Sequence, residues 1–238
     1  MALKNPYGVH GQADDSSKFQ RAPGLPDQVK KTAKDFHRYA VALEERKDLV
    51  NASSGYRRSA ATYSVEAVEA EKAGRLVSAR TCNNNAGVEY RNQSRIEIDP
   101  TVKRVALKNA GMHFGLAAKC ANMITTKIDR EDHVQRAKWF GTEATDHEKS
   151  YTDYSAASDG RTRDSLLKAA VARLRLAFEL AFFRNDEVAK QMGIASDYFN
   201  RAKRPDLTSE LSGCNSWDKI TRFTDEVDAS VSMEEISE

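Results

Sequence analysis

The chain has 238 residues, 40% of them hydrophobic, with only 12 glycines and 5 prolines. This length can bury one substantial core, and the lack of proline between Pro26 and Pro100 favours long helices over a strand-and-turn protein. The 37 basic and 35 acidic residues leave a formal net charge of +2, which excludes a strong global field directed at nucleic acid or an anionic membrane. No apolar run reaches the roughly 20 residues of a membrane span, so we expect a soluble intracellular protein, cytoplasmic or nuclear, without membrane contact.

The two ends differ in composition from the middle of the chain. Residues 1–25 have turn and disorder chemistry and few large apolar side chains, so we expect a flexible N-terminal arm. The acidic, serine-containing residues 229–238 are expected to form a flexible tail. Residues 26–228 are then a single helical domain.

The first elements are a helix and a helical hairpin. Apolar residues approximate helical spacing over residues 27–50, and residues 51–55 are expected to break the chain. Two helices follow, near 56–73 and 75–92, with Gly74 closing the first of them. Small residues at the contact positions would let these two helices approach closely. These positions are Ala67, Ala70, Ala79 and Ala86.

The hairpin resembles one tetratricopeptide repeat, over about residues 60–93. The likeness lies in the large, small and turn positions of that family, here Tyr63, Ala67, Gly74, Leu76, Ala79 and Ala86. Asn83 departs from the pattern, because the family usually has an aromatic or aliphatic residue there. The resemblance implies stacked helical pairs that act as a scaffold without catalytic groups. A generic antiparallel hairpin is the alternative interpretation.

The second pair has clearer boundaries. Asp99 and Pro100 are a start signal, an N-capping carboxylate followed by proline at the first helical position, for a helix that runs to about Thr126. Asp129 is expected to cap the next helix, which runs to about Tyr151. A polar loop follows over residues 155–163.

The third pair begins near Asp164 with the most hydrophobic segment of the chain, which we expect to form the core. Asn185 and Asp186 are expected to make the turn to its partner helix, and Pro205 to stop that helix. A last short helix is expected over residues 219–227. The prediction is therefore an all-α protein of about seven helices in antiparallel hairpins, arranged as a tetratricopeptide-like array or an irregular bundle.

Two sets of residues could carry chemistry. Glu143 and His147 are one helical turn apart, with His133 upstream, but their spacing matches neither a carboxylate di-iron bundle nor a zinc peptidase. His113 and Cys120 could act as base and nucleophile, but no orienting group accompanies them. We therefore expect no metal, no cofactor and no enzymatic activity, with Cys120 as a buried thiol.

Basic residues gather at the beginnings of several predicted helices. If aligned, they could follow a phosphate backbone, but acidic residues are interleaved with them, and solvated helix faces are the favoured interpretation. These residues are Lys30, Lys31, Lys34 and Arg38, then Arg57 and Arg58, then Lys103, Arg104 and Lys108.

The expected function is a non-enzymatic adaptor that binds a protein or peptide partner in a groove between stacked hairpins. The tetratricopeptide resemblance places the groove face of one helix at Ser64, Val68, Glu71 and Lys72. In the third pair, Lys168, Arg175 and Glu179 share one face of an apolar helix and complete the candidate groove. The alternative for Arg175 and Glu179 is an exposed ion pair one turn apart.

Two other functions remain alternatives to the adaptor. One is a self-assembling structural protein, a homo-oligomer, that coats or binds nucleic acid. The other rests on residues 174–192, a helix, a short turn and a second helix, which look similar to the long helical pairs of meiotic crossover scaffolds. That resemblance implies an adaptor in the nucleus.

Overall fold

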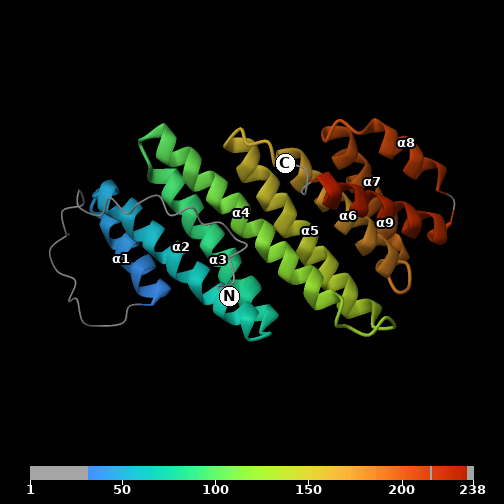
Figure 1. The fold of residues 1–238 in the computed structure, drawn as a ribbon, viewed down its shortest axis with the longest axis horizontal. Helices are drawn as coiled ribbons and strands as arrows, with labels where there is room; N and C mark the ends of the chain where they lie inside the picture. Colours follow the sequence, from blue (N-terminus) through green and yellow to red (C-terminus); the bar gives the residue numbers. More distant parts are fainter. Residues whose placement is uncertain (1–31, 215, 235–238) are drawn as a thin grey trace, which may run out of the picture. The chain divides into compact units, whose positions relative to one another are not determined.

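The computed structural model describes residues 32–214 and 216–234, and these contain nine α-helices and no strand. The all-α prediction is confirmed, although the described helices exceed the expected seven. The arm expected over residues 1–25 lies outside the described residues, as do Lys30 and Lys31. In chain order the helices are α1 (Ala33–Glu45), α2 (Leu49–Lys72), α3 (Leu76–Ile96), α4 (Pro100–Thr125), α5 (His133–Ala156), α6 (Thr162–Leu180), α7 (Asn185–Arg201), α8 (Pro205–Gly213) and α9 (Trp217–Glu234) (Figure 1).

The expected chain break at residues 51–55 is wrong. Helix α2 begins at Leu49 and passes through this segment without interruption. The turn comes earlier, where Lys47 has a positive φ of 62° and the Asp48 carboxylate caps α2 by accepting from the Asn51 amide. Gly55 serves packing instead, because a Cβ there would lie 2.9 Å from the Cβ of Ala40 in α1.

The α2–α3 hairpin forms as expected. Gly74 ends the turn region with φ of 70°, a conformation that other residues adopt at a cost. Ala79 is fully buried in one cluster with Ala70 and Cys120, and Ala86 in another that includes Tyr63. The small residues therefore do line tight helix contacts.

The second helical pair, α4 and α5, also forms as predicted, but both ends of α5 differ from the expected positions. Asp99 caps α4 by accepting from the amides of Thr101 and Val102. Helix α5 is capped by Asp132 rather than by Asp129, because it begins three residues later than expected, and it continues to Ala156.

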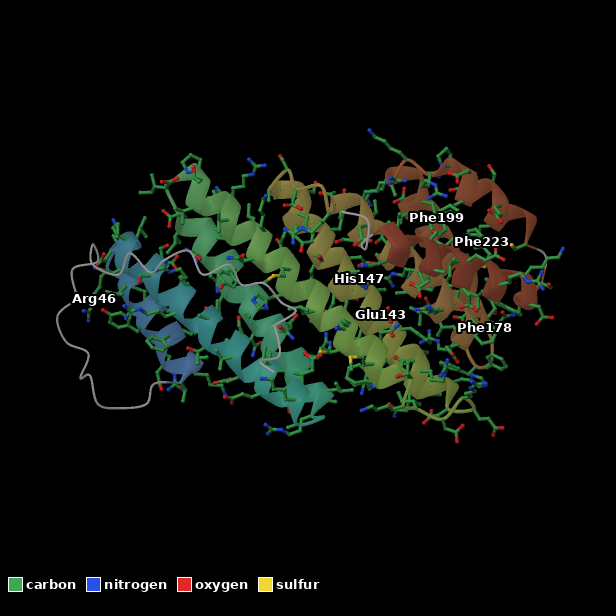
Figure 2. The ribbon with its side chains drawn as sticks, in the orientation of Figure 1. Arg46, Glu143, His147, Phe178, Phe199 and Phe223 are labelled. Atoms are coloured by element: carbon green, nitrogen blue, oxygen red, sulfur yellow. The ribbon has the colours of Figure 1, made fainter. Side chains whose placement is uncertain are left out.

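The predicted core helix, α6, is buried around most of its circumference, but it ends at Leu180. Phe182 and Phe183 follow it in a turn and are 57% and 43% exposed. Asn185, expected in the turn, instead begins α7. The largest apolar cluster joins α6 to α7 and α9, and there Phe199 meets the edge of Phe223 at a ring distance of 5.9 Å (Figure 2).

The last part of the chain contains more helix than expected. Pro205 follows the end of α7, but it is also the first residue of α8, a position that tolerates proline because no intrahelical amide bond is lost there. Helix α9 continues past Val227 to Glu234, so the domain boundary expected at residue 228 falls inside a helix.

Helices α1 to α7 pack in chain order, each against the next, and α9 returns to pack against α6. Figure 1 shows α1 to α5 lying side by side in this order. Side chains also join every second helix, which makes α1, α3, α5 and α7 one layer. The contacts are Glu44 with Arg95, Asp146 with Arg80, Asp153 with Arg91, and Arg201 over the Tyr151 ring.

Candidate functional site

Two of the four groove residues expected in α2, Ser64 and Glu71, interact with residues of α4. The Ser64 hydroxyl lies 3.0 Å from Nε2 of His113 in α4. One turn along, Val68 is 43% exposed, and Lys72 beyond it is also exposed. Burial raises the pKa of the Cys120 thiol in α4 to about 11, and the nearby carboxylate of Glu71 contributes to this increase. We call the region defined by Ser64, Val68 and Glu71 of α2 and the buried His113 and Cys120 of α4 the α2–α4 seam.

His113 holds the seam together. Its Nδ1 lies 3.1 Å from the amide oxygen of Asn83 in α3, and its ring stacks on Tyr90 at 5.6 Å. Burial lowers the pKa of His113 to about 4, so the imidazole is neutral near pH 7. Because an amide oxygen only accepts, Nδ1 carries the proton and donates it to Asn83. Asn83, which departs from the tetratricopeptide pattern, therefore orients a histidine that joins three helices.

His113 and Cys120 both interact with Asn83 of α3, and no direct contact between the two is recorded among the described residues. His113 bonds to Asn83 and Ser64, whereas Cys120 packs with Ala70 and Ala79. A thiol with a pKa of about 11 is protonated near neutral pH, and the protonated form is a weak nucleophile. This geometry supports the interpretation of Cys120 as a buried apolar residue.

The charged residues of α6 are not brought together with the α2–α4 seam into one groove. Arg175 bonds to Asp228 of α9 at 2.8 Å, and Lys168 lies 3.1 Å from Asp164 within α6. Glu179 is only 1% exposed and accepts from Arg136 and His133 of α5. The expected exposed pair of Arg175 and Glu179 is therefore wrong. Because α6 is covered by α5 and α9, Arg175 and Glu179 each meet a charge on a neighbouring helix instead.

Glu143 and His147 are both buried on the inner face of α5 (Figure 2). Burial raises the pKa of Glu143 to about 7, although Arg175 opposes this, and Asn122 of α4 donates to its carboxylate at 3.2 Å. Burial also lowers the pKa of His147 to about 3, and the nearby cations Lys168 and Arg175 lower it further. A glutamate and a histidine one turn apart are often a solvated pair, but both are buried here because helix α5 has neighbours on this side.

The third residue considered with them, His133, bonds to Glu179 through Nδ1 at 2.8 Å. Within residues 32–214 and 216–234, no three histidine, cysteine, aspartate or glutamate side chains are placed to hold a metal ion.

Sequence reasoning missed the ion pairs between α3 and α5. Arg80 binds Asp146, which is fully buried, and Arg91 binds Asp153 at 2.8 Å. The guanidinium of Arg91 also lies 4.4 Å from the centre of the Phe114 ring. Asp146 and Asp153 are two turns apart and share one face of α5, but that face is opposite the apolar positions Ala137 and Ala144, so the helical pattern did not reveal these pairs.

No model of a known protein family matches the chain, and no curated protein matches it. In the part of the chain that the structure describes, no helix has both the length and the apolar character needed to cross a membrane. Any functional conclusion therefore depends on the surfaces and contacts of the described helices.

Proposed function

We propose that the protein is a non-enzymatic adaptor that binds a segment of another protein along the α2–α4 seam. The observation that supports this is the exposure of Val68, an aliphatic side chain left 43% accessible between the half-buried Ser64 and Glu71. Val65, on the same helix, is 58% exposed. Neighbouring exposed aliphatic residues are typical of interaction surfaces.

The seam is also well ordered for binding. Ser64 and His113 join its two helices through a hydrogen bond, and the alanine contacts of Ala70 and Ala79 hold α3 beneath them. A surface fixed in advance loses little conformational entropy when a partner binds. Lys72, exposed one turn beyond Val68, provides a positive charge for a carboxylate on the partner.

The adaptor is better supported than the nucleic-acid-coating alternative. In the cluster at the beginning of α4, Arg104 donates to the Ala157 carbonyl and Lys108 bonds to Asp159 at 2.9 Å. These two cations are engaged within the chain, which reduces the charge available to follow a phosphate backbone. Lys103 and Arg104 are the exposed cations of this cluster.

The test is a selection of displayed random peptides on the immobilised full chain, followed by fluorescence polarisation of the enriched peptide. We expect a Kd of about 1–100 µM and a loss of about tenfold or more in Val68→Glu, because the charge must be buried in the complex. Val88→Glu is the matched control, since Val88 in α3 is 40% exposed but lies outside the seam.

Equal losses in the two variants would contradict a site at the seam, and failure to enrich any peptide would contradict the adaptor. Tight, salt-sensitive binding of a single-stranded oligonucleotide, with no peptide binding, would favour the coating alternative.

A further inference from the structure

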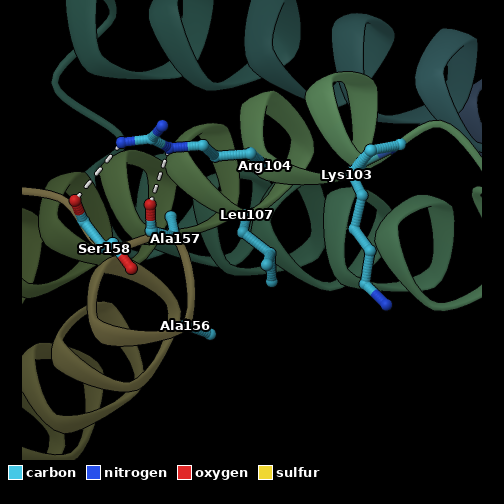
Figure 3. A pocket seen from close by; sticks show the side chains of 7 residues that line it. Lys103, Arg104, Leu107, Ala156, Ala157 and Ser158 are labelled. Atoms are coloured by element: carbon cyan, nitrogen blue, oxygen red, sulfur yellow. Dashed lines mark hydrogen bonds between the residues drawn. The ribbon is translucent and has the colours of Figure 1, made fainter.

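A shallow cleft of about 230 Å³ lies where α4 begins and α5 ends (Figure 3). Its apolar lining comes from Pro100 and Leu107 of α4 and from Ala156, the last residue of α5. Its cations are Lys103 and Arg104, also from α4. We call it the α4–α5 cleft, and none of its lining residues belongs to the α2–α4 seam.

Arg104 is held in place by the end of α5. Its Nε donates to the Ala157 carbonyl at 2.9 Å, and its Nη2 lies 3.4 Å from the Ser158 carbonyl (Figure 3). Carbonyls at the end of a helix lack intrahelical partners, so the guanidinium satisfies them. The cleft therefore contains a fixed positive charge.

The charges around the cleft favour an anion. Lys108 and Arg161 both bind Asp159, at 2.9 Å each, and their hydrogen bonds hold the pKa of that carboxyl well below its usual range. Asp99, next to Pro100, is engaged as the cap of α4. Lys103 is exposed and, among the described residues, has no ion-pair partner. The positive charges of the cleft are thus only partly balanced.

We propose that the α4–α5 cleft binds an acidic peptide segment of a partner protein, with an aliphatic side chain on Leu107 and Ala156 and an adjacent carboxylate at Lys103. An apolar floor beside a cation matches a residue pair of this kind better than a phosphate backbone, which offers no aliphatic group. The volume is below the ~300–1,000 Å³ of small-molecule pockets and suits a single side chain. This site is additional to the seam of the proposed function and does not depend on it.

The experiment uses the full chain and a fluorescein-labelled peptide amide, Gly-Ser-Glu-Leu-Asp-Glu-Gly-Ser, followed by fluorescence polarisation at low salt. We expect Lys103→Glu to weaken binding about tenfold or more, through like-charge contact. Lys127→Glu is the matched control, since Lys127 is an exposed lysine just beyond the other end of α4, and we expect a change of less than about twofold. Lys103 is exposed, so its variant should fold, which circular dichroism checks.

Three further probes identify the ligand chemistry. A peptide with its acids changed to amides, and one with leucine changed to glycine, should each bind at least about tenfold more weakly. Equal binding of the neutral peptide, or equal losses in Lys103→Glu and Lys127→Glu, would overturn the proposal. A single-stranded oligothymidylate that binds more tightly than the peptide, and loses binding in Lys103→Glu, would also overturn it by showing a phosphate site. Val68→Glu should leave peptide binding here unchanged, which separates this result from that of the seam.

Discussion

Glu143 shows how a single buried residue makes stability depend on pH. Its carboxyl, on α5, faces Asn122 of α4, Arg175 of α6 and Asp228 of α9. Burial, with a smaller contribution from Asp228, favours the protonated form, whereas Arg175 and the hydrogen bond from Asn122 favour the charged form. The net result is a pKa of about 7, raised from 4.5. Near neutral pH, the Glu143 carboxyl is therefore close to its titration midpoint.

We predict that Glu143→Gln removes a pH-dependent loss of stability. Because the folded pKa is above the unfolded value, the stabilisation from Glu143 is complete below pH 4.5 and is lost as pH rises through about 7. The free energy of unfolding of the variant, relative to wild type, should therefore increase over this range by roughly 3 kcal/mol. Urea denaturation at several pH values measures it, and a constant difference would contradict the prediction.

His147→Gln is a matched comparison with the opposite sign. The pKa of His147 is lowered from 6.5 to about 3, so its contribution is present above pH 6.5 and is lost as pH falls. The variant should gain stability relative to wild type as pH decreases below 6.5. The two variants together separate Glu143 from a general effect of disturbing α5.

At the scale of elements, α9 shows how a distant segment completes the core. Ile220, Phe223 and Val227 join the cluster of α6 and α7, and Asp228 binds Arg175 at the edge of that cluster. A helix with one buried apolar face is stable mainly through such packing rather than through its own propensity. Arg175 thus forms a structural contact between α6 and α9. We therefore do not include it in the candidate binding groove.

We predict that Arg175→Glu loosens α9, because it places a carboxylate against Asp228 and near Glu143. The pair is partly exposed, with side-chain exposures of 22% and 40%, so we expect a loss of about 1–3 kcal/mol in the free energy of unfolding. Limited proteolysis should then cut the link between α8 and α9 more quickly. The exchanged pair Arg175→Glu with Asp228→Arg should restore part of the loss. A single variant as stable and as protease-resistant as the parent would show that the apolar face alone holds α9.

At the scale of the whole described domain, each helix from α1 to α6 packs against the next one in the chain. Polar contacts also join helices that are two apart in the chain, such as α3 and α5. Asp146 is fully buried on α5 and binds Arg80 of α3, while Lys149 bonds to both Asp146 and Asn84. These contacts between α3 and α5 add to the interfaces that each makes with α4.

We predict that Asp146→Ala costs about 3 kcal/mol, at the low end for a broken buried ion pair, because Arg80 and Lys149 are partly exposed and can reach water. The control is Asp197→Ala, which removes an exposed pair with Arg201 and should cost less than about 1 kcal/mol. Chemical denaturation measures both. Similar losses in the two variants would show that the buried contact between α3 and α5 stabilises the fold no more than an exposed ion pair does.

The sequence by itself determined the all-helical class and several local features. Asp99 with Pro100 started a helix and Gly74 closed one, because capping and left-handed backbone geometry depend on a few adjacent residues. The alanines of the α2–α3 hairpin were also recognisable, since small residues at helical spacing imply a close neighbour. For the candidate site, helical spacing puts Ser64, Val68 and Glu71 on one face of α2, the face to which we assign the proposed seam.

Only the tertiary structure decided how distant helices meet. Gly55 looks like a breaker in the sequence, but its contact with Ala40 makes it part of a helix, because packing outweighs weak propensity. The partners of Arg175 and Glu179 lie on α9 and α5, and no local spacing specifies them. The same is true of the α4–α5 cleft, which forms only where the beginning of one helix meets the end of another. Helical periodicity indicates which side of a helix is buried, whereas the identity of the neighbour depends on how the whole chain packs.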